Sequence, residues 1–157
     1  MALRKVRIHP DPILRKKSKD VEVFDQKLHN LLDDMRDTMY NAGGVGLAAV
    51  QVGILRRALV IDVTEEQNQL VEIINPRVLK RKGTQQGQEG CLSIPELSGL
   101  VDRPAETTVV AQNRYGEEFT FTAKEYQCVA LNHELDHLEG VLYLDHAIEL
   151  YRKNDEE

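Results

Sequence analysis

Apolar residues recur at helical spacing near the N-terminal end of the chain. Between about Asp25 and Asn41 they fall three and four residues apart, at Leu28, Leu31, Leu32, Met35 and Met39. This spacing is typical of an amphipathic helix with one face toward a core. The glycine pair at 43–44 is expected to end it.

A second helical pattern occupies residues 122–140. Apolar residues cover one side at Val129 and Ala130, and Leu131, Leu135 and Leu138 cover another. A helix that is apolar on two sides is mostly buried. Thr122 and Glu125 have the spacing of a capping box at its start, and Gly140 fits its end.

Short β-rich runs lie between the two helical patterns. "ALVIDV" (58–63) and "VEIINP" (71–76) predict strands, and "ETTVVAQ" and "EEFTFTA" flank "NRYG" as the arms of a hairpin. Residues 11–25 read as irregular. The pattern predicts an α+β fold with antiparallel or mixed sheets around the second helix, preceded by an N-terminal helix, as a single domain over residues 1–157.

Composition adds a few limits to this picture. The 157 residues are 41% hydrophobic and 29% charged, with a net charge of −6, which is ordinary for one globular domain. No apolar run resembles a secretory signal or is long enough to cross a bilayer. We expect a cytoplasmic protein whose partners include neither nucleic acid nor a membrane.

The candidate chemistry begins with "HELDHLEG" at positions 133–140. His133 and His137 stand one helical turn apart on one face, and Glu134 follows the first histidine. Such a pair can be two ordinary polar residues of an amphipathic helix. Burial favours a metal site instead, because buried imidazoles and carboxylates are costly without partners and a divalent cation satisfies both imidazoles.

A catalytic metal of this kind usually has three protein ligands and one open position. The only histidine after His137 is His146, near the C-terminal tail. Cys91, in "QEGCLSIPE", is the better candidate, because a glycine-containing loop can turn a thiolate toward a site. Cys128 lies within the helical pattern and reads as a small buried residue. A disulfide between the two cysteines is not expected.

Three segments resemble the motifs of peptide deformylase, in the order that the family has them: "GVGLAAVQ" (44–51), "EGCLS" (89–93) and "HELDH" (133–137). The resemblance extends over nearly the whole chain. It implies the deformylase fold and the removal of formyl from the N-formylmethionine of newly made polypeptides. It also implies one divalent metal, natively Fe(II), while Zn(II), Ni(II) or Co(II) also suit such ligands.

The resemblance also implies roles for individual residues. Cys91, His133 and His137 would bind the metal, and Glu134 would act as general base and then as general acid. The Gln51 side chain and the Leu92 backbone N–H would donate to the oxyanion. The peptide would add as an extra strand along a slot formed by Val45, Gly46, Gly90, Tyr126, Val129 and Ala130. Glu89 and Arg103 would pair and hold the Cys91 segment.

The chain departs from many bacterial members in two places. They have an arginine just after "EGCLSIPE", where this chain reads "LSGL", so a basic contact to the peptide is expected to be missing. They often end in a basic helix that docks on the ribosome, whereas this chain ends in "NDEE", so that docking is not expected here.

Two other functions compete with the deformylase reading. A metallopeptidase with the H-E-x-x-H motif would cleave internal peptide bonds, but it gives "EGCLS" no role. A non-catalytic relative that binds peptides or stores metal would need neither Gln51 nor Glu134.

Overall fold

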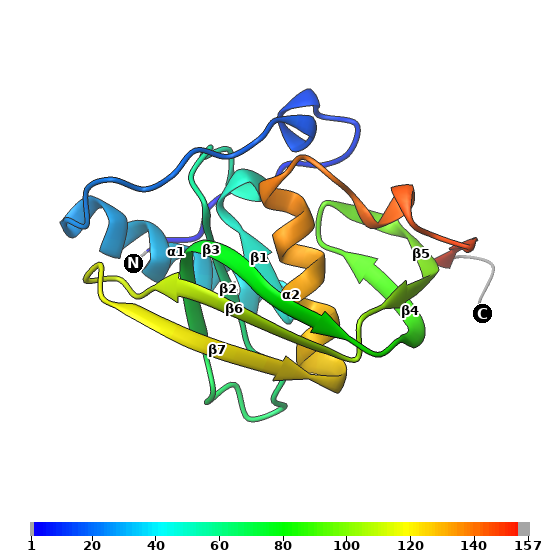
Figure 1. The fold of residues 1–157 in the computed structure, drawn as a ribbon. Helices are drawn as coiled ribbons and strands as arrows, with labels where there is room; N and C mark the ends of the chain where they lie inside the picture. The colour runs from blue at the N-terminus through cyan, green and yellow to red at the C-terminus, as the bar shows by residue number, and fades with distance from the viewer. Residues whose placement is uncertain (1, 154–157) are drawn as a thin grey trace.

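The structure is a computed structural model that describes residues 2–153 (Figure 1). Its helices are α1 (Gln26–Asn41) and α2 (Glu125–Leu138), with short 3-10 helices at Pro12–Arg15, Ala49–Val52 and Tyr143–Asp145. Its strands are β1 (Gly46–Ala48), β2 (Ala58–Ile61), β3 (Val71–Lys82), β4 (Gln85–Cys91), β5 (Ile94–Arg103), β6 (Glu106–Gln112), β7 (Glu118–Lys124) and β8 (Glu149–Arg152).

The strands form two sheets around helix α2. The larger sheet has the order β1-β2-β3-β6-β7 and the smaller one β4-β5-β8, with every neighbouring pair antiparallel. In Figure 1, α2 lies between the larger sheet and the β4–β5 hairpin. The expected α+β fold with a central helix is therefore confirmed.

Strand β2 is buried on both faces. Leu59 and Ile61 belong to the core beneath α2, and Ala58 and Val60 belong to the core beneath α1. Side chains of a strand alternate between its two faces, so this one strand packs against both helices. All four of its residues are fully buried, which explains the unbroken apolar run "ALVI".

Within residues 2–153, neither helix is long and apolar enough to cross a membrane.

Helix α1 begins and ends where the sequence predicts. The Asp25 side chain caps it by accepting from the backbone N–H of Leu28 at 3.1 Å. At the other end Gly43 has φ +72°, and the N–H groups of Gly43 and Gly44 donate to the carbonyls of Tyr40 and Met39. A left-handed residue here suits glycine, which has no Cβ to clash.

Three local expectations are wrong. Thr122 is not a helix cap, because it lies in β7 and its hydroxyl pairs with that of Thr108 across the hairpin at 2.9 Å. Helix α2 instead starts after Lys124. Cys91 does not lie in a loop but is the last residue of β4. Strand β3 also continues to Lys82, well beyond the apolar run that predicted it.

Candidate active site

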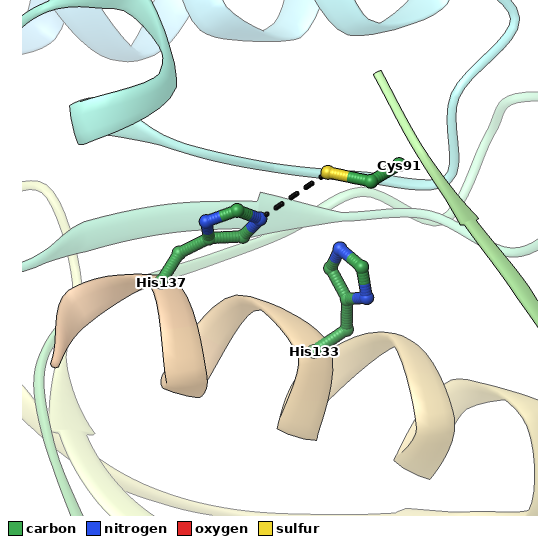
Figure 2. Close-up of side chains that lie close together, drawn as sticks. All are labelled: Cys91, His133 and His137. Carbon is green, nitrogen blue, oxygen red and sulfur yellow. Dashed lines mark hydrogen bonds between the residues drawn. The ribbon is translucent and has the colours of Figure 1, made fainter. Parts of the chain in front are cut away.

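Cys91, His133 and His137 meet between β4 and α2. The two histidines lie one turn apart on α2, and Figure 2 shows both rings on the side of the helix that faces the Cys91 sulfur. One ligand atom from each residue lies within 4.8 Å of the others. Cys91 Sγ is 3.4 Å from His137 Nε2.

This geometry fits a divalent metal. A thiolate sulfur and an imidazole nitrogen bound tetrahedrally at about 2.3 and 2.1 Å lie roughly 3.6 Å apart, close to the 3.4 Å between Cys91 and His137. Burial lowers the pKa of His137 well below its usual range, so its ring is neutral. Burial also lowers the pKa of His133, but the charges of Glu134 and Cys91 outweigh it and raise that pKa. The neighbouring acidic groups thus favour a positive charge at His133, which a bound divalent cation would also supply.

A buried ion pair orients His133. Its Nδ1 lies 2.9 Å from Glu89 Oε1, and Arg103 donates to both oxygens of Glu89 at 2.7 and 2.9 Å. Arg103 also donates to Asp136 at 2.7 Å. A carboxylate can only accept, so Nδ1 carries the hydrogen and leaves Nε2 for a metal. Burial raises the pKa of Glu89, but the hydrogen bonds from Arg103 and His133 outweigh it and lower the pKa to about 2.

Glu134 is placed for proton transfer. It is buried, and its Oε1 has no hydrogen-bond partner within residues 2–153. Burial is the main reason that its pKa rises to about 7, which suits a group that takes and returns a proton at neutral pH. The backbone approaches it closely, since a Cβ on Gly46 would lie 2.5 Å from Glu134 Oε2.

Gln51 points its amide nitrogen at the same cluster. It lies in the 3-10 helix that follows β1, and its Oε1 accepts from the backbone N–H of Ala48 at 2.9 Å. This bond fixes the direction of the amide group. Its Nε2 donates to Ser93 Oγ at 3.1 Å and lies 3.6 Å from Cys91 Sγ. Leu92 stands between Cys91 and Ser93, in the turn that joins β4 to β5.

A cleft of about 430 Å³ opens onto this cluster. All six residues expected to line a peptide slot do line it: Val45, Gly46, Gly90, Tyr126, Val129 and Ala130. Six other predicted site residues also line the cleft: Gln51, Glu89, Cys91, Leu92, His133 and Glu134. His137 and Arg103 do not line it. Strands β1 and β4 both lie at the edges of their sheets, so each of them has one strand edge that is not paired within residues 2–153.

Several residues that contact or line the site were not singled out in the sequence. Asp136 supports Arg103 and lies inside the H-E-x-x-H run itself. Ser93 accepts from Gln51, and the Tyr143 ring stacks on His133 with centroids 6.0 Å apart. Lys153 lines the cleft from the C-terminal tail. Only Asp136 and Ser93 lie within motifs where a search by position could have found them.

An α+β fold with a buried Cys/His/His cluster and the buried Glu134 carboxylate beside it is typical of a metal-dependent hydrolase. Comparison with known proteins identifies the family. The family model of polypeptide deformylase matches residues 3–153. Peptide deformylase of Caldicellulosiruptor bescii is 52% identical over 148 residues, covering 94% of this chain and 87% of the relative. That of Acetivibrio thermocellus is 50% identical over 157 residues, covering 100% and 91%.

Solved structures agree with this result. The crystal structure of a peptide deformylase from Legionella pneumophila has a TM-score of 0.89 and 42% identity, covering 92% of this chain and 85% of the other. That from Thermotoga maritima has a TM-score of 0.89 and 40% identity, covering 94% and 99%. The chain belongs to the polypeptide deformylase family. It is therefore a metal-dependent hydrolase that removes the N-formyl group from newly made peptides.

Proposed function

We propose that the chain performs this reaction with Cys91, His133 and His137 as metal ligands and Glu134 as the group that moves protons. The observation that carries the proposal is their convergence: three ligand atoms lie within 4.8 Å of one another, beside a cleft that the buried Glu134 carboxylate also lines. The metal that we propose is Fe(II), one per chain, while Zn(II), Ni(II) and Co(II) suit the same thiolate and imidazole ligands. When bound, a divalent metal supplies Lewis acidity toward the formyl oxygen and the attacking water.

Glu134 handles the protons of the reaction. Its carboxylate takes a proton from the attacking water, whose oxygen forms a bond to the formyl carbon. When the C–N bond breaks, Glu134 returns that proton to the leaving nitrogen, and the products are formate and a free amine. Its raised pKa, about 7 through burial, makes both transfers accessible near neutral pH.

Gln51 and Leu92 stabilise the charge that develops on the formyl oxygen. The Gln51 amide is held in place through Ala48, so its Nε2 needs little rearrangement to donate. The Leu92 backbone N–H is the proposed second donor, from the turn directly after Cys91. Donors fixed before the reaction are effective because they need no reorganisation as charge forms.

The peptide binds as an extended segment between the edges of β1 and β4, where unpaired backbone groups can pair with it. Gly46 and Gly90 allow the peptide backbone to approach closely. Val45, Val129 and Ala130 provide an apolar slot for an unbranched methionine side chain, and Tyr126, which is 54% exposed, lies at its rim. Glu89 and Arg103 hold His133 in position for the metal.

We propose that residues 1–157 act as one catalytic domain in the cytoplasm, where formylmethionyl peptides are made. The site supports this, because it draws residues from both sheets and from α2. We propose no nucleic-acid or membrane partner. Residues 149–152 form strand β8, and we propose no docking on the ribosome through a basic helix there.

The test measures formate and free amine released from a formyl-methionyl peptide by protein loaded anaerobically with Fe(II), Ni(II) or Zn(II). We expect formate from all three, with a fast Fe(II) form that decays in air because iron and thiolate oxidise. The Ni(II) form should be stable and active, and the Zn(II) form stable and slower. Cleavage of internal bonds in unformylated peptides would favour a metallopeptidase, and binding without turnover would favour a non-catalytic relative. Equal, air-stable rates would contradict iron as the working metal.

A further inference from the structure

Lys153 lines the same cleft as Cys91 and Glu134. It is the only lysine or arginine among the lining residues of the described chain. The other ionisable side chains there already have roles: Cys91 and His133 in the ligand cluster, Glu134 beside it, Glu89 in the ion pair with Arg103, and Tyr126 at the rim of the slot. The ammonium of Lys153 is thus a cationic feature of the cleft without an assigned role.

Strand pairing brings Lys153 to this place. Strand β8 pairs with β5, with Arg152 opposite Leu97, so Lys153 follows directly at the end of β8. Because β5 lies between β8 and β4, the Lys153 side chain must reach across β5 to the cleft. Its Nζ lies 3.8 Å from the point where a Cβ on Gly90 would stand. Because Gly90 has no side chain, there is open space for the Lys153 ammonium beside it, and Gly90 directly precedes Cys91.

The Lys153 side chain is also available to a ligand. The residue is exposed, and no carboxylate within residues 2–153 forms an ion pair with it. A lysine ammonium is a point charge on a flexible stem that donates in several directions. It can therefore follow a charged group that enters the cleft on the β4 side.

We propose that Lys153 is a specificity-determining residue that binds a carboxylate of the substrate, carried by a residue that follows the formylmethionine. This inference rests on the proposed function, because the peptide must lie extended between β1 and β4 with its first residue at the Cys91 cluster. Residues after the first then run out along the cleft, with alternate side chains directed to opposite sides. A side chain on the β4 side meets the ammonium beside Gly90. The carboxylate has two sources, an Asp or Glu side chain or the free C-terminus of a short peptide.

The test compares kcat/KM for amidated formyl-methionyl tetrapeptides with Glu or Gln at position two, three or four. We expect the wild type to prefer Glu at one of these positions by about 2- to 5-fold, the range for an exposed charge pair. The preference should appear in KM and fade in high salt. Lys153→Ala should abolish it, Lys153→Arg should keep it, and Lys153→Glu should reverse it. A formyl-Met-Ala-Ser tripeptide, whose side chains are uncharged, tests the second source of the carboxylate when its neutral amide is compared with its anionic free acid.

Arg152→Ala is the matched control, because it removes one positive charge from the adjacent residue, which does not line the cleft. An equal loss of the Glu preference in this variant, or a preference unchanged in Lys153→Ala, would overturn the proposal. A preference only for the free C-terminus would overturn the side-chain source and keep the carboxylate contact. Failure of every variant to release formate from the neutral amidated peptide would instead refute the proposed function. The rate on that peptide should be the same in Arg152→Ala as in the wild type.

Discussion

Glu134 is the single side chain on which the proposed proton transfers depend. Glu134→Gln keeps the size and one carbonyl-type oxygen of the side chain but removes its ability to hold a proton. We expect a variant that retains one metal per chain and loses about 10²–10⁴-fold in kcat, the usual effect of removing a general acid–base group. Metal analysis and formate release on the same preparation measure the two quantities. Full turnover with full metal occupancy would remove Glu134 from the mechanism.

Much of the site was predictable at the scale of single residues because the sequence places its chemistry in short motifs. His133, Glu134 and His137 fall together on one helical turn, and Cys91 and Gln51 stand in segments that resemble the family's motifs. Residues that reach the site only through the folded chain could not be found this way. Tyr143 stacks on His133 from the segment after α2, and Lys153 arrives through the pairing of β8 with β5.

Strand β4 shows why part of the fold escaped prediction at the scale of elements. Its buried residues are Glu89 and Cys91, and the rest of "QQGQEGC" is polar or glycine. A strand that turns its functional residues inward has no apolar alternation to detect. The same holds for the end of β3, where "LKRK" is exposed and is held by pairing with β6. By contrast β6 is a β-rich run and β7 alternates at Phe119 and Phe121, and both were predicted as the arms of a hairpin.

Gly46 in strand β1 allows a test of how closely the backbone approaches the carboxylate of Glu134, the proposed catalytic group. A Cβ on Gly46 would meet Glu134 Oε2 at 2.5 Å, so Gly46→Ala must displace that side chain. We expect kcat to fall at least about 10-fold, since small displacements of a catalytic group cost large factors in rate. Gly87→Ala is the control, because it also lies in an edge strand and its added Cβ would meet no atom within 4 Å. Equal formate-release rates for both variants would show that Glu134 tolerates the contact.

The Glu89–Arg103 pair joins β4 to β5, and its contacts to Asp136 and His133 add α2. Glu89→Gln leaves Arg103 with Asp136 alone, and breaking a buried pair in this way is expected to cost about 3 kcal/mol at neutral pH. The measurement is the free energy of unfolding in urea, on metal-free protein.

The same pair predicts a pH dependence. The pKa of Glu89 is about 2 in the folded protein, below its ordinary value of 4.5. The folded state therefore favours the charged form, and this stabilisation is present above about pH 4.5 and is lost as pH falls toward about 2. The free energy of unfolding of Glu89→Gln should fall less over that window than that of the wild type. An equal fall in the free energy of unfolding of the two proteins over this pH window would show that Glu89 is not responsible.

At the scale of the whole molecule, the proposed metal site lies between the small sheet and helix α2. Cys91 belongs to the small sheet through β4, while His133 and His137 belong to α2, whose apolar face packs on the large sheet. Figure 1 shows α2 between these two parts. A metal bound by all three side chains therefore links the small sheet to the main core, and its removal should loosen that link.

Metal removal is therefore expected to lower the thermal stability of the whole chain. A ligand that binds only the folded state at about 1,000 times its Kd adds about 4 kcal/mol, and each kcal/mol raises Tm by roughly 2–4 °C in a chain of this size. The metal-free protein should thus melt roughly 8–16 °C lower, and Ni(II) or Zn(II) should restore it. Cys91→Ala should lose the metal-dependent rise, while Cys128→Ala, which changes a buried cysteine outside the cluster, should lose stability but keep the rise. An equal rise in both variants would place the stabilising metal elsewhere.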